Sequence, residues 1–169
     1  LSNQSVNAQG FAEWVKAYNQ SAICSSSQPP KALQQQVQHF TSFSSDLIRA
    51  SHSAELCLQR SADSILSELR EVEITCLALP LSWKINTWLI TCRIAWLLGI
   101  TGQAETYQAA KQRLSQAVKK LEVSAQANEN VVVFAHALSN RIICKQLQKQ
   151  GWKLESSHQG YWASTELSK

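Results

Sequence analysis

The chain of 169 residues contains 44% hydrophobic and 17% charged side chains, which is ordinary globular usage and excludes an intrinsically disordered protein. Its net charge of +4 comes from 16 Lys and Arg residues against 12 Asp and Glu residues. These charges are scattered along the sequence, which argues against a nucleic-acid-binding surface. The length fits a single compact domain over residues 1–169.

The cysteines and the apolar stretches favour a cytoplasmic protein without a membrane span. The cysteine count is odd and no Cys-x-x-Cys pair occurs, so reduced thiols are expected at Cys24, Cys57, Cys76, Cys92 and Cys144. Residues 1–9 lack the apolar core of a signal peptide, and the apolar stretch 77–100 is broken by a proline and two basic residues. Because the chain begins with Leu1 and contains no methionine, we expect the true start to lie upstream.

The first third of the chain predicts helix, loop, helix and strand. Apolar residues recur at helical spacing over residues 7–20, where Asn7 is a plausible N-cap. A Ser-rich stretch that ends in two prolines, 21–30, predicts a loop. A short helix is expected from Lys31 to about His39, and a buried strand is expected over residues 46–51.

The middle of the chain predicts two helices around a strand. Leucines and isoleucines at helical spacing predict a helix over 53–69, and alternating apolar residues predict a strand over 71–76. Residues 83–98 form a helical pattern that contains three tryptophans, and Gly99 and Gly102 are expected to end it.

The last third completes an α/β pattern. A long amphipathic helix is predicted over 103–128, followed by a continuous apolar strand over 131–135 of the kind that parallel sheets bury on both faces. A helix over 139–150 and an edge strand over 161–167 follow. Alternating strands and helices predict a three-layer α/β sandwich with a mostly parallel sheet flanked by helices.

One polar residue lies where such sheets place their ligands. His136 follows the 131–135 strand, at the carboxyl end where open α/β sheets form a binding crevice, and Asn140 lies one helical turn further along. The alternative is a histidine that caps the next helix or bonds a backbone carbonyl. The position alone leaves both interpretations open.

The residues around His136 carry a family resemblance. The run Val131-Val-Val-Phe-Ala-His136-Ala-Leu-Ser-Asn140-Arg, with Gly151-Trp152 downstream, resembles the C-terminal signature of the phosphoglycerate mutase-like histidine phosphatases, in particular their short bacterial branch. In that family the histidine stands between two glycines, and here Ala135 and Ala137 replace them. Residues 11–23 and 69–74, and the tryptophan-containing helix, are similar to the same branch.

The resemblance implies a fold and a set of roles. It implies the three-layer fold of that family, a small phosphorylated substrate or phosphate as the ligand, and no cofactor. By resemblance His136 is the phosphate-binding histidine, Glu71 the general acid, and Asn140 and Ser53 further phosphate-binding residues. The alternative for Glu71 is a solvated carboxylate at a strand edge. Since His39 and His158 belong to no pair at metal-ligand spacing, no metal is predicted.

Two departures from the family pattern bear on activity. The family nucleophile belongs to an Arg-His-Gly motif on the first, central strand, and this motif occurs nowhere in the 169 residues. A Ser-x3-Arg-x3-Ser-Ala motif is matched from Ser53 to Ala62, which puts Cys57 at the arginine position. Either Arg49 or Arg60 replaces that arginine, or both are surface residues. Cys57 itself is expected to be a buried structural thiol.

Two functions from different classes remain open. The first is a histidine phosphatase-like protein, a phosphomonoester hydrolase by ancestry, in which the first central strand either lies upstream of residue 1 or has been lost together with turnover. The second is a non-catalytic, α-rich interaction or peripheral membrane protein that uses the tryptophan-rich helix 83–98. The sequence predicts neither the substrate nor the oligomeric state.

Overall fold

A computed structural model describes residues 4–24, 26–127, 130–158 and 160–169. The chain divides into two compact units, which are described separately. Unit 1 consists of residues 1–21 and 72–111, and unit 2 of residues 22–71 and 112–169.

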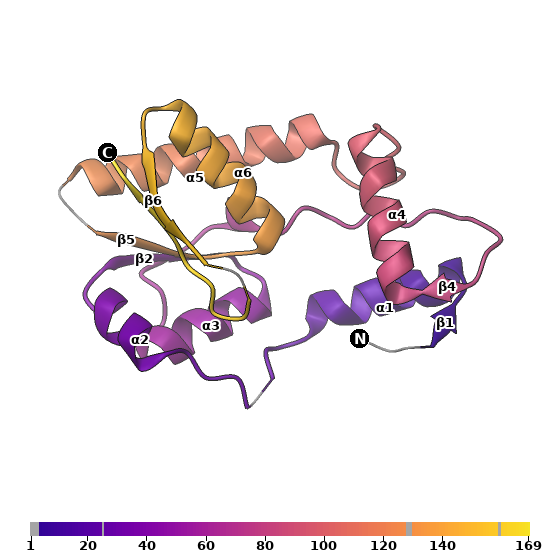
Figure 1. The fold of residues 1–169 in the computed structure, drawn as a ribbon, viewed down its shortest axis with the longest axis horizontal. Coiled ribbons are helices and arrows are strands. Elements are labelled where there is room, and N and C mark those ends of the chain that lie inside the picture. Colours follow the sequence, from indigo (N-terminus) through magenta and orange to yellow (C-terminus); the bar gives the residue numbers. More distant parts are fainter. Residues whose placement is uncertain (1–3, 25, 128–129, 159) are drawn as a thin grey trace. The chain divides into compact units, whose positions relative to one another are not determined.

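Unit 1 is built on two helices and a small antiparallel strand pair (Figure 1). Strand β1 (Ser5–Val6) pairs with β4 (Trp83–Lys84), and each strand leads into a helix, α1 (Ala8–Gln20) or α4 (Ile85–Leu97). The predicted cap is confirmed, because Asn7 Oδ1 accepts a hydrogen bond from the Gly10 backbone N–H at 2.9 Å.

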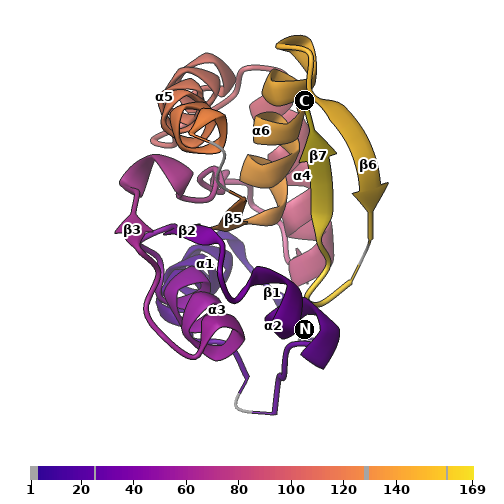
Figure 2. The same cartoon turned by 90° about the vertical axis from the view of Figure 1, so that its left-hand side faces the viewer.

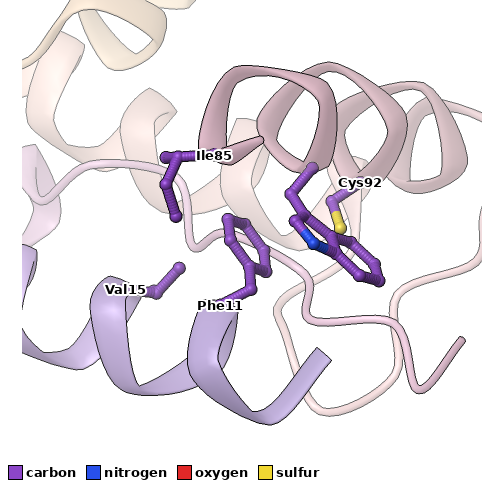
Figure 3. Close-up of a cluster of buried hydrophobic side chains, with 5 residues drawn as sticks. Phe11, Val15, Ile85 and Cys92 are labelled. Atoms are coloured by element: carbon purple, nitrogen blue, oxygen red, sulfur yellow. The ribbon is translucent and has the colours of Figure 1, made fainter. Parts of the chain in front are cut away.

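The core of unit 1 is aromatic (Figure 3). Side chains from α1 and α4 meet there, namely Phe11, Val15, Ile85, Trp88 and Cys92. The Trp88 ring stacks on Phe11 with the ring centroids 5.4 Å apart, and its Nε1–H donates to the Val6 carbonyl at 2.9 Å. Trp96 is also buried, and Trp83 packs against Trp88. These tryptophans therefore form the core and are not exposed anchors, so they do not supply the contact surface considered for helix 83–98.

Local interactions determine where α4 ends and where α5 begins. Leu98 caps α4, and Gly99 adopts a φ of +87° directly after it, which confirms the predicted glycine terminator. Helix α5 (Tyr107–Gln126) begins four residues later than predicted. The reason is a side-chain cap, because Thr106 Oγ1 accepts a hydrogen bond from the Ala109 N–H at 3.1 Å.

Unit 2 contains a parallel sheet with the strand order β3-β2-β5. The strands are β2 (Thr41–Ser44), β3 (Ser64–Ile65) and β5 (Val131–Phe134), and Thr41 is in register with Val131. Figure 2 shows α2 (Lys31–Val37) and α3 (Ile48–Leu58) on one side of the sheet, with α6 (Ala137–Lys149) and the neighbouring turns of α5 on the other. This arrangement confirms the predicted α/β layers.

The remaining elements of unit 2 are short. A 3-10 turn spans Ser67–Leu69, and strands β6 (Lys153–Ser157) and β7 (Thr165–Ser168) form an antiparallel hairpin. The edge strand predicted over 161–167 therefore exists but begins later. The strand predicted over 131–135 is confirmed as β5, although its side chains are half-buried and not fully enclosed.

Three sequence predictions are wrong. The strand predicted over 46–51 lies earlier, as β2. Its sequence was not identified as a strand because most of its residues are polar. Ser42 is fully buried but bonds Asp63 through its N–H and its hydroxyl. The helix predicted over 53–69 is instead α3, which ends where Gln59 adopts a φ of +55°. Residues 71–76 form no strand.

Candidate functional site

The candidate site lies at the carboxyl ends of β2 and β5. Their parallel pairing continues through the hydrogen bond from the Ser45 N–H to the Phe134 carbonyl, at 2.9 Å, so the residues that follow the two strands lie together. His136 Nε2 is 3.1 Å from Ser45 Oγ, and both residues are buried, with exposed fractions of 8% and 0%. Ser45 was not predicted as a site residue, because the strand was expected to begin after it.

The backbone of His136 begins helix α6, but its side chain does not cap it. His136 adopts the extended N-cap conformation, and its carbonyl accepts a hydrogen bond from the Asn140 N–H at 2.7 Å. Its imidazole makes no capping hydrogen bond and lies against Ser45 instead. The helix-capping alternative for this side chain is therefore wrong.

Four charged side chains act on the His136 imidazole. Burial is the main cause that lowers the pKa of His136 below 6.5; Glu71 and Asp46 oppose this, while Arg49 and Arg113 add to it. The imidazole is thus mainly neutral near pH 7. A neutral ring has one N–H donor and one acceptor nitrogen, so it exchanges a single hydrogen bond with the Ser45 hydroxyl.

We expect the pKa of His136, followed by NMR of its imidazole signals, to lie below 6.5 in the folded protein and near 6.5 in urea. Because the unfolded chain then binds a proton at higher pH than the folded one, this histidine reduces stability as the pH falls from about 6.5 to its folded pKa. A folded pKa at or above the urea value would contradict the buried environment.

Glu71 is anchored to the first turn of α6. Its Oε1 accepts a hydrogen bond from the Ser139 N–H at 3.2 Å, and its Oε2 lies 3.5 Å from the Leu138 N–H. Ser139 Oγ, 3.2 Å from the same carboxylate, donates to the Arg70 carbonyl at 2.7 Å. Glu71 is half-buried, so the alternative of a solvated carboxylate at a strand edge is wrong.

We expect Glu71→Gln to lower the free energy of unfolding by about 1 kcal/mol, because the positive end of α6 loses a carboxylate partner. Urea denaturation followed by circular dichroism measures this. The matched control is Glu55→Gln, which changes an exposed carboxylate on α3. Equal stability of the two variants would contradict the anchoring role.

Two arginines hold the segment that carries Glu71. Arg70 Nε donates to both carboxylate oxygens of Asp46, at 2.7 and 2.9 Å. Arg113, from α5, donates to the carbonyls of Glu68 and Arg70, at 2.6 and 3.1 Å. The segment before Glu71 is therefore fixed to the carboxyl end of β2 and to α5.

Arg49 is, with Arg113, one of two arginines whose charge acts on His136. It belongs to the first turn of α3, and its charge acts on the imidazole. Ser45, Arg49 and Ser53-Ala54 also fit the Ser-x3-Arg-x3-Ser-Ala spacing, eight residues before the match chosen from the sequence. The motif therefore identifies Arg49 from the sequence, but the strand was predicted too late in the chain for this match to be selected.

The other candidates for that arginine position lie elsewhere. Arg60 pairs with Asp63 at 2.7 Å and donates to the carbonyl of Phe40, which precedes β2 at the end opposite Ser45. Cys57 has an exposed fraction of 2% and packs against Val37 and Leu58. The prediction of a buried structural thiol is confirmed, and burial raises the pKa of this thiol.

The two remaining predicted residues, Asn140 and Ser53, each lie one helical turn after His136 or Arg49. Asn140 follows His136 by four residues on α6, and Ser53 follows Arg49 by four residues on α3, where its hydroxyl donates to the Arg49 carbonyl at 2.8 Å. Within the described residues, no three His, Cys, Asp or Glu side chains gather as metal ligands. Across the same residues, every helix is too short or too polar to span a bilayer.

Comparison with known proteins places this arrangement in a family. The model of the histidine phosphatase superfamily (branch 1) matches residues 29–169. The crystal structure of TTHB049 from Thermus thermophilus is similar, with 20% identity, coverage of 80% of this chain and 78% of that one, and a TM-score of 0.44. The structure of the Rv3214 reading frame from Mycobacterium tuberculosis is also similar, with 9% identity, coverage of 92% of this chain and 90% of that one, and a TM-score of 0.50. No curated protein matches significantly.

Proposed function

Since the chain belongs to the histidine phosphatase superfamily, we propose that it acts on small phosphomonoesters and that unit 2 binds their phosphoryl group beside His136. The observation that carries this proposal is the buried pair of His136 and Ser45 at the carboxyl edge of the sheet, with the Arg49 charge acting on the imidazole. A phosphoryl group carries close to two negative charges near pH 7. Cations and N–H donors are the partners that such a group requires.

In this proposal the phosphoryl oxygens contact residues from two helices. His136 and Arg49 bind non-bridging oxygens and neutralise the charge that is distributed over them during transfer. Asn140 and Ser53 add polar contacts from the next turns of α6 and α3. A neutral His136 donates one hydrogen bond to the bound oxygen, and the negative charge of that oxygen favours a second proton on the ring.

Glu71 is the proposed general acid. As the bond between phosphorus and the leaving oxygen breaks, the Glu71 carboxyl gives its proton to that oxygen. Its hydrogen bonds with the first turn of α6 support this role, because they fix the carboxyl in the neighbourhood of His136. The phosphoryl group passes to a histidine nitrogen and then to water.

The acceptor histidine needs separate consideration. The 169 residues contain no Arg-His-Gly motif, and the other histidines, His39, His52 and His158, are exposed. We therefore propose that residues 1–169 alone bind phosphate compounds without turnover, and that hydrolysis requires a nucleophilic strand in addition. In the described sheet β5 is an edge strand, where a further strand can pair without displacing another.

The test compares residues 1–169 with the protein isolated from its native organism, using intact mass and the hydrolysis of p-nitrophenyl phosphate. We expect hydrolysis only from a protein heavier than 18.8 kDa, and a loss of about 100-fold or more in its His136→Ala variant. The control is His52→Ala, which removes an exposed histidine on α3. Hydrolysis that is unchanged by His136→Ala would refute the proposed site.

A further inference from the structure

The outer face of helix α4 in unit 1 carries no charge. The exposed residues of this helix are Asn86, Thr87, Ile90, Ile94 and Leu97, and Leu98 and Ile100 continue the same apolar surface beyond its end. All five of these aliphatic side chains are strongly exposed, Ile90 at 61%, Ile94 at 53%, Leu97 at 62%, Leu98 at 76% and Ile100 at 56%. The outer face of a monomeric helix is normally polar, so this surface, called the α4 face, indicates a contact.

The other residues of α4 pack against the rest of unit 1. Ile85 and Cys92 point into the aromatic core (Figure 3), and Trp88 is buried in the same cluster. Arg93, the one charged residue of α4, donates to the Val72 carbonyl at 3.4 Å and lies over the Trp96 ring, 5.1 Å from its centre. The α4 face is therefore not an edge of the core of unit 1 but a second apolar surface of the same helix.

We propose that the α4 face pairs with the α4 face of a second copy of this chain. Ile90, Ile94 and Leu98 recur every four residues and form one ridge. The commonest helix packing inserts such a ridge into the matching groove of another helix at about −50°. Two copies of the α4 face can pack in this way around a two-fold axis, because the ridge of each copy then lies in the groove of the other and the same patch is used on both.

The absence of charge on the α4 face favours a second copy of the chain over other occupants. An uncharged face can meet itself without burying a like-charge pair or an unpaired ion, and homodimer interfaces are both apolar and poor in charge. An acidic or basic partner would find no counter-ion among Ile90, Ile94 and Leu98. A lipid surface is usually bound by helices with a row of Lys and Arg on the polar face, whereas the exposed residues of α4 include neither.

The experiment measures the mass of residues 1–169 in solution by sedimentation equilibrium. We expect a dimer of about twice 18.8 kDa for the wild type, and a dissociation constant raised about 10-fold or more in Ile94→Glu and in Leu98→Glu, because each places like charges against each other. The matched control is Val123→Glu, an equally exposed aliphatic residue on α5, which leaves the dimer intact. Circular dichroism verifies that each variant folds.

Three results would overturn the proposal. A wild-type protein that stays monomeric at high concentration has no such dimer, and a dimer that persists in Ile94→Glu and Leu98→Glu uses another surface. A monomer that co-sediments with vesicles of phosphatidylcholine and phosphatidylglycerol, and loses this binding in Ile94→Glu, has a lipid surface as the occupant instead.

Discussion

Arg49→Ala is expected to weaken the binding of inorganic phosphate to residues 1–169 by a factor of about 10 to 100, since a charge-assisted hydrogen bond contributes roughly 1.5 to 3 kcal/mol. Arg49 lies at the start of α3 and its charge acts on His136. A planar, permanently charged guanidinium binds two phosphoryl oxygens at once, which no neutral side chain at this position can do. Isothermal titration calorimetry measures the affinity.

The matched control for this prediction is Arg60→Ala. Arg60 was the other candidate for the same role, but it is bonded to Asp63 and to the Phe40 carbonyl, before β2 begins. Its removal is expected to affect stability and to leave phosphate affinity unchanged. If Arg60→Ala weakened phosphate binding and Arg49→Ala did not, the Ser45, Arg49 and Ser53 alignment would be wrong.

The second large effect concerns the core of unit 1. Trp88→Ala is expected to lower the free energy of unfolding by about 3 to 5 kcal/mol, because it leaves a large cavity. It also removes the partner of the Val6 carbonyl, which accepts the Trp88 Nε1–H at 2.9 Å. Total stabilities are roughly 5 to 15 kcal/mol, so this one change removes a large part of them.

Urea denaturation followed by circular dichroism tests this prediction. The control is Tyr161→Ala, which removes an aromatic ring that is 99% exposed and is expected to change the stability by less than about 0.5 kcal/mol. A Trp88→Ala protein as stable as the Tyr161→Ala protein would mean that the Trp88 ring is not part of the core, and would restore its role as a surface anchor.

The sequence predicted the elements whose signal is local. Helices α1 and α4 were found because their apolar residues repeat at helical spacing and because Asn7 and Gly99 mark their ends. Strand β5 was found from its run of valines. In each case the deciding residues lie within one or two turns of each other along the chain.

The sequence failed where distant partners decide the structure. Strand β2 consists of Thr, Ser and Phe, and its buried Ser42 is tolerated because Asp63, 21 residues away, bonds it. This error displaced the arginine motif by eight residues and concealed Arg49. The anchoring of Glu71 by Ser139 joins residues 68 positions apart, so periodicity could not predict it.

The central claim is that phosphate binds beside His136, and an NMR titration of its imidazole with and without inorganic phosphate tests this most directly. A bound phosphate favours the protonated ring, so we expect phosphate to raise the pKa of His136 from its lowered starting value. Sodium chloride at the same ionic strength is the control and should leave the pKa unchanged. Equal pKa values in saturating phosphate and in chloride would contradict the proposed site.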